Sequence, residues 1–112
     1  MSSVESSTDR IRKLNDLFRQ THRGGRVLFT SGVIALDVAI QRKIVRAVAD
    51  FNRFTKDNDP HGEHDCAVIE VEGHRIIFKI DYYDLALTYG SVDSADPALT
   101  TRVMTIMLAD EY

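Results

Sequence analysis

The residues of this chain that are best suited to chemistry stand together in one short segment. Residues 57–65 read Asp57-Asn58-Asp59-Pro60-His61-Gly62-Glu63-His64-Asp65. The segment holds four carboxylates and two imidazoles, and no large apolar side chain interrupts it. Pro60 and Gly62 favour turns, so the pattern predicts a solvated loop. Loops of this kind are where binding and catalytic side chains concentrate.

One chemistry that this loop permits is metal binding. His61, Glu63 and His64 offer the imidazole and carboxylate ligands that zinc and other first-row divalent ions take. The spacing matches no standard zinc motif, because paired cysteines and the H-E-x-x-H pattern are absent. An EF-hand is excluded as well, since Val68 stands where that loop needs a bidentate Glu. These residues define one hypothesis: a metal-dependent hydrolase or a metal-stabilised domain, with no other cofactor.

The other chemistry is protein recognition by an acidic surface. The run Asp81-Tyr82-Tyr83-Asp84 places two aromatic rings between two carboxylates, and tyrosine is enriched at interfaces. The expected binding residues are Asp57, Asp59, Glu63, Asp65, Asp81, Tyr83 and Asp84. An acidic surface attracts basic proteins, including those that handle nucleic acid. This gives the leading hypothesis, a non-enzymatic binding module. The alternative is that Tyr82 belongs to the core and the acids only keep the protein soluble.

Composition narrows the class of protein. With 112 residues, 44% hydrophobic and 28% charged, the chain predicts one globular domain over residues 1–112, with residues 1–7 flexible. The single cysteine, Cys66, cannot form an internal disulfide and favours the reducing cytoplasm. We expect no membrane contact, because no signal peptide or long apolar run is visible. No glycine-rich phosphate loop or nucleophile elbow is present, which weighs against an enzyme.

Charge is divided unevenly along the chain, although the net value is only −3. Residues 1–56 hold eleven Lys and Arg against five Asp and Glu, whereas residues 57–112 hold three against twelve. Either the two halves neutralise each other across the fold, or one of them faces a charged partner. Arg42, Lys43, Arg46 and Arg53 form a basic helix surface, but no aromatic or glycine pattern of nucleic-acid readers accompanies them, so direct nucleic-acid binding is not expected. Self-association is compatible with this pattern.

Hydrophobic periodicity predicts the elements. A helix over residues 8–22 has the apolar stripe Ile11, Leu14, Leu17 and Phe18, and a short strand follows over residues 26–30. A second helix has the stripe Ile40, Ile44, Ala47, Val48 and Phe51. A hairpin pairs residues 66–71 with 75–83 around Gly73, and residues 85–89 form a further short strand. A last helix opens at Asp96-Pro97 with the stripe Leu99, Val103, Ile106 and Met107. The fold class is therefore α+β, a single two-layer domain of order α-β-α-β-β-(β)-α whose small antiparallel sheet is packed by helices.

Three stretches carry a resemblance to a known family. They are Phe54-Thr55-Lys56 with the loop 57–65, the run Lys79-Ile80-Asp81-Tyr82-Tyr83-Asp84, and Asp96-Pro97 with Thr100-Thr101-Arg102-Val103-Met104-Thr105-Ile106-Met107-Leu108-Ala109. They resemble a family of small bacterial proteins of unknown function that are often encoded on plasmids and other mobile elements. The resemblance implies a cytoplasmic accessory protein and assigns no activity to any residue. By association, it also implies inhibition of a host defence complex of the CRISPR or restriction type.

Overall fold

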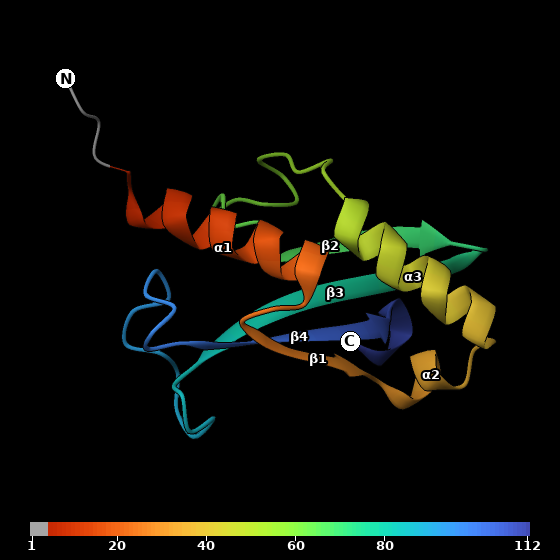
Figure 1. Ribbon diagram of the computed structural model, residues 1–112. Helices are drawn as coiled ribbons and strands as arrows, with labels where there is room; N and C mark the ends of the chain where they lie inside the picture. Colours follow the sequence, from red (N-terminus) through yellow and green to blue (C-terminus); the bar gives the residue numbers. More distant parts are fainter. Residues whose placement is uncertain (1–4) are drawn as a thin grey trace.

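The computed structural model describes residues 5–112, which form three α-helices and a four-stranded mixed sheet (Figure 1). The helices are α1 (Ser7–Thr21), α2 (Ser31–Ile34) and α3 (Val38–Asp50), with a final 3-10 turn η1 (Ala109–Glu111). The strands are β1 (Gly25–Phe29), β2 (Cys66–Val71), β3 (His74–Tyr83) and β4 (Thr101–Leu108). Their spatial order is β1-β4-β3-β2. The predicted α+β class is confirmed.

The two layers are the sheet and the pair of long helices, α1 and α3, which cover the same face of it (Figure 1). The predicted stripe of α3 is confirmed, since Ile44 and Val48 are buried in the core against β3 and β4. Asp37 caps this helix by accepting a hydrogen bond from the Ala39 N–H. The opposite face of the sheet carries side chains such as Leu28 and Val68, both half exposed. An amphipathic α3 therefore fixes which face of the sheet is buried.

Helix α1 confirms the predicted first helix to within one residue at each end, but its buried face differs from the prediction. Residues 1–4, part of the segment predicted to be flexible, lie outside the described residues, whereas Ser6 caps the helix and Ser7 begins it. Leu17 was predicted in the buried stripe but is 54% exposed. Phe18 is buried as predicted, and Asn15 and Arg19 are buried beside it. Polar side chains can take core positions when hydrogen bonds satisfy them, and this holds here for Asn15 and for the two terminal nitrogens of Arg19, while Arg19 Nε has no partner.

The predicted C-terminal helix is wrong: the chain forms β4 there, at the centre of the sheet. Strand β4 runs antiparallel to β3 and parallel to β1, so the sheet is mixed, not antiparallel throughout as predicted. A central strand is covered by neighbours on both sides, which buries Val103 and Met107 on one face as well as Met104 and Ile106 on the other. Burial on both faces hides the two-residue period, and Val103, Ile106 and Met107 then mimic helical spacing.

The hairpin prediction is confirmed, and the short strand after it is wrong. Glu72 and Gly73 both have positive φ, 51° and 78°, which suits a two-residue turn between β2 and β3. Residues 85–89 form turns, because the Asp84 carboxylate accepts hydrogen bonds from the Thr88 and Tyr89 N–H groups. Only Gly90 makes an isolated bridge, to Tyr83.

Candidate functional site

The acidic loop lies against α1, held by a set of polar side chains that we call the polar cluster. Its members are Asn15, Asp16, Arg19, Glu63, His64, Tyr82 and Arg102. They come from α1, the loop, β3 and β4, so segments far apart in the sequence meet at one point. The cluster decides how much of the acidic loop remains free for a partner.

Asn15 is the centre of this cluster and is fully buried. Its amide nitrogen donates to the Glu63 carbonyl at 2.9 Å and to the Tyr82 hydroxyl at 2.8 Å. Its amide oxygen accepts from Arg102 Nε at 2.8 Å. One side chain therefore connects α1 with the loop and with two strands.

Tyr82 couples the loop to the sheet through its hydroxyl, which donates to the Glu63 carboxylate at 2.7 Å. Burial, and then this hydrogen bond to the carboxylate, raise the pKa of Tyr82. The Arg102 guanidinium lies 5.2 Å from the centre of the Tyr82 ring. Tyr82 is thus partly buried and packs against the core, which is close to the alternative interpretation of the sequence.

His64 stands between two carboxylates. Its Nδ1 lies 2.9 Å from an oxygen of Asp16, and its Nε2 lies 3.7 Å from an oxygen of Asp59. The ring stacks on Phe54 with centroids 3.8 Å apart. Arg19, also buried, binds the same Asp16 oxygen at 2.5 Å and donates to the Val48 and Phe51 carbonyls. The imidazole is therefore occupied by the protein's own acids.

The loop acids predicted to bind a partner differ in exposure. Asp57 is exposed, Glu63 and Asp65 are half-buried, and Asp59 is only 8% exposed. Burial raises the pKa of the Asp65 carboxyl. The expectation of a wholly solvated acidic loop is therefore wrong, because the cluster draws part of the segment inward.

The metal ligands predicted from the sequence do not gather into a site. Among residues 5–112, no three His, Cys, Asp or Glu side chains are placed to hold an ion together. His61 is exposed, while His64 turns to Asp16 and Asp59. The geometry gives the metal hypothesis no support.

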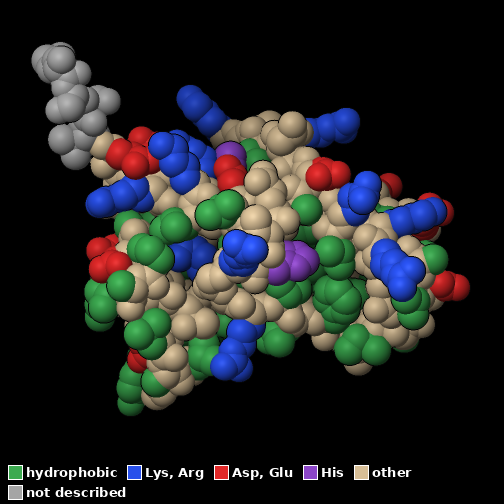
Figure 2. Space-filling view, in the orientation of Figure 1, with side chains coloured by type: hydrophobic (Ala, Val, Ile, Leu, Met, Phe, Trp, Pro, Cys, Tyr) green, Lys and Arg blue, Asp and Glu red, His purple; other side chains and the backbone are tan. Residues whose placement is uncertain are grey.

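Ion pairs contribute little to neutralising the two oppositely charged halves of the sequence among residues 5–112. Within the part of the chain that the structure describes, one Lys or Arg of residues 1–56 pairs with a carboxylate of residues 57–112: Lys43 with Glu72, at 2.6 Å. Arg42, Arg46 and Arg53 are exposed. Figure 2 shows several Lys and Arg side chains standing out from the helical face. The basic side chains of the first half and the carboxylates of the second half can thus both contact charged partners.

The second predicted patch, around residues 81–84, lies where β3 ends. Asp81 pairs with Lys79 at 3.0 Å, and Tyr83 and Asp84 are half-buried. From there the chain enters residues 84–100, which we call the acidic lobe. The lobe contains three Asp and no Lys or Arg. Its largest exposed side chains are Leu85, Tyr89, Val92 and Leu99.

The acidic lobe has no helix or strand of its own and is held by side chains. Arg102 donates to the Ser94 carbonyl at 2.7 Å, and Ser91 and Thr100 share a hydrogen bond of 2.7 Å. Asp93 and Asp96 accept hydrogen bonds from the backbone two residues on. Arg102 therefore supports both the polar cluster and the lobe, and nothing in the sequence pattern pointed to this.

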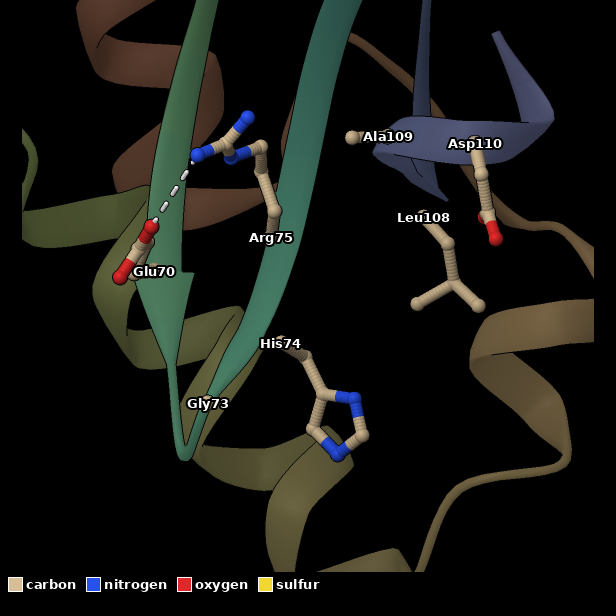
Figure 3. Close-up of a pocket in the computed structure, with 7 residues that line it drawn as sticks. All are labelled: Glu70, Gly73, His74, Arg75, Leu108, Ala109 and Asp110. Carbon is tan, nitrogen blue, oxygen red and sulfur yellow. Dashed lines mark ion pairs between the residues drawn. The ribbon is translucent and has the colours of Figure 1, made fainter.

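A hollow at the hairpin end of the sheet is a second candidate for a site. It has a volume of about 420 Å³ and lies between the hairpin and η1. Figure 3 shows that Glu70 and Arg75 point toward each other, with 3.6 Å between their charged atoms, while Asp110 lies on the far side. His74 points away from the Glu70–Arg75 pair. These side chains do not converge on one point where a substrate could react.

Sequence reasoning missed Asn15, Arg19 and Arg102. A signal existed for Asn15, since it falls with Ile11 and Phe18 at the helical spacing i, i+4, i+7 and so replaces an apolar residue on the stripe. Arg102 carried no signal, because the segment around it was assigned to a helix.

Fold and surface together define a small two-layer α+β protein with one helical face, an inward-held polar loop and an exposed acidic lobe. Residues 29–111 match the model of a family described as protein of unknown function (DUF3768), and the chain belongs to this family. No curated protein and no solved structure matches the chain. Within residues 5–112, none of the helices has both the length and the apolar character needed to cross a bilayer.

Proposed function

We propose that this protein is a non-enzymatic binding module that recognises a basic protein surface through the acidic lobe. One observation carries the proposal. Of the ten large hydrophobic side chains exposed among residues 5–112, four lie in the lobe, where Val92 is 89% and Tyr89 75% exposed. Figure 2 shows hydrophobic side chains gathered at the left of the view, where the lobe lies in Figure 1. Exposed apolar groups with a charged rim are typical of protein interfaces.

Charge selects the kind of partner. The lobe supplies Asp84, Asp93 and Asp96 and contains no Lys or Arg of its own. Arg10 and Lys13 of α1 lie at its edge, where they line a hollow with Ala95 and Pro97. Asp57 adds a further exposed carboxylate on the acidic loop. Complementary charge speeds encounter and rejects acidic partners, while the exposed aromatic and aliphatic groups supply affinity. A nucleic-acid-handling complex of the CRISPR or restriction type is the first class that we would test, because such proteins present basic surfaces.

The test compares proteins captured from a bacterial lysate by three forms of the chain. The lobe variant is Tyr89→Ser/Val92→Ser, and the matched control is Ile34→Ser/Val38→Ser, which removes two exposed apolar side chains near the start of α3. A partner should be captured by the wild type and the control, lost from the lobe variant, and released by added salt. Equal capture by all three forms would contradict the proposal.

A further inference from the structure

The strand β2 lies at the edge of the sheet, paired with β3 alone. Natural proteins protect such edges with Lys, Pro or a bulge. Strand β2 has none of these: its sequence is Cys-Ala-Val-Ile-Glu-Val, and its register with β3 is unbroken over six pairs. Its only charged residue is Glu70. This edge is unusually open to pairing.

The hydrogen-bond pattern shows which backbone groups are free. The Ile80 N–H donates to the Asp65 carbonyl at 2.7 Å, which fixes the phase of the antiparallel ladder. Ala67, Ile69 and Val71 therefore bond to β3, and Val68 and Glu70 direct their N–H and C=O groups outward. No other residue in the described range 5–112 makes a hydrogen bond to these outward groups. A strand placed alongside would find donors and acceptors two residues apart.

A groove of about 700 Å³ runs beside this edge. One side is formed by Val68, Ile69 and Glu70, and the other by the end of α3 and the residues after it, including Ala47 and Phe51. An edge strand next to a helix is the arrangement that binds extended peptides by strand addition, where the backbone gives affinity and pockets give specificity. In this protein the free edge and the groove lie at the same place, along Val68, Ile69 and Glu70.

We propose that the β2 edge and this groove bind an extended peptide of a partner protein, which adds to the sheet as a fifth strand. The groove lies toward the hairpin end of β3, opposite the acidic lobe, so this second contact does not depend on the function proposed above. The facing residues define the peptide. A Lys or Arg would lie beside Glu70, where it would share the exposed carboxylate with Arg75, 3.6 Å away, and a β-branched apolar residue would lie beside Val68, because cross-strand neighbours pair by charge and shape. The side chain between them would enter the groove, whose far side combines Ala47 and Phe51 with Asp50, Asn52, Arg53 and Asn58, and would be small.

The test uses a displayed library of random seven-residue peptides, selected on the wild-type protein. Val68→Pro removes one outward N–H without breaking a bond to β3, and proline is tolerated at such an edge position. Val68→Thr is the matched control, since it keeps both the N–H and the branched shape. Selected peptides, made synthetically, should bind Val68→Thr within about threefold of the wild type and bind Val68→Pro at least about tenfold more weakly. Equal binding to Val68→Pro, or no enrichment of any peptide, would overturn the proposal.

A second variant and a second measurement cover the case in which Val68→Pro does not fold. Glu70→Lys changes an exposed side chain and should weaken the basic peptides about threefold. Binding should also slow hydrogen exchange at the Val68 and Glu70 amides and leave the Ile69 amide, already paired with β3, unchanged. A dimer of the free protein in which the Val68 amide is already protected would show that a second copy occupies the edge, and would refute the peptide assignment.

Discussion

Replacing Asn15 with alanine should remove one of the side chains that hold the acidic loop against α1. Asn15 is fully buried and makes three hydrogen bonds, to the Glu63 carbonyl, the Tyr82 hydroxyl and Arg102 Nε. In Asn15→Ala, Tyr82 keeps its bond to the Glu63 carboxylate, but the Glu63 carbonyl and Arg102 Nε lose their partner. Each buried group left unpaired costs about 1–3 kcal/mol, and a charged one costs more. We therefore expect a loss of about 3–5 kcal/mol, a large share of the roughly 5–15 kcal/mol that stabilises a typical domain.

Urea unfolding followed by circular dichroism measures this loss as a change in the free energy of unfolding. The matched control is Asn52→Ala, because Asn52 is exposed. Surface changes of this kind usually stay within about 0.5 kcal/mol. A loss below about 1 kcal/mol for Asn15→Ala would mean that water replaces the amide freely, and the reasoning about the polar cluster would be refuted.

Three further predictions concern single residues. Gly25→Ala should lower the free energy of unfolding in urea by more than about 2 kcal/mol, because a Cβ at residue 25 would lie 2.1 Å from the Arg102 carbonyl oxygen. The control Gly90→Ala should be nearly neutral, because a Cβ at residue 90 would lie 3.9 Å from its nearest neighbour. Asp65→Asn should be more stable than the wild type at pH 7. Burial raises the pKa of the Asp65 carboxyl in the folded state, so the native protein binds the proton more tightly than the unfolded chain does. The stability of the wild type therefore falls as the pH rises through the unfolded and then the folded pKa, and asparagine avoids this loss. If Asp65→Asn proves less stable at pH 7, the assigned burial penalty is wrong. Burial also raises the pKa of the Cys66 thiol, so iodoacetamide at pH 8 should alkylate it more slowly in the native protein than in urea, and equal rates would speak against this environment.

The sequence predicted those elements whose pattern matches their surroundings. Helix α3 has one buried stripe and one solvated side, so its period is visible, and the hairpin is marked by Gly73 at its turn. The prediction of a helix where β4 lies was wrong because a central strand is buried on both faces. Its β-branched residues, Thr101, Val103, Thr105 and Ile106, were the available signal for a strand.

The candidate site was predictable in composition but not in orientation. The loop 57–65 was singled out for its acids and histidines, and Glu63 and His64 of this loop do make hydrogen bonds to α1. Its orientation depends on Asn15, 48 residues before Glu63, and no local pattern encodes so distant a contact. The exposure of Tyr89 and Val92 depends in the same way on Arg102 holding the lobe in place. Long-range hydrogen bonds therefore decided which of the acidic residues remain accessible.

In the proposed function, the acidic lobe contacts a basic partner protein. Once a partner has been isolated, hydrogen exchange measured on the free and bound protein tests this claim most directly. Binding should slow exchange of the amides in residues 84–100, with Tyr89 and Val92 among those affected, and the effect should weaken as salt is added. Slowed exchange elsewhere, with the lobe unchanged in the complex, would contradict it.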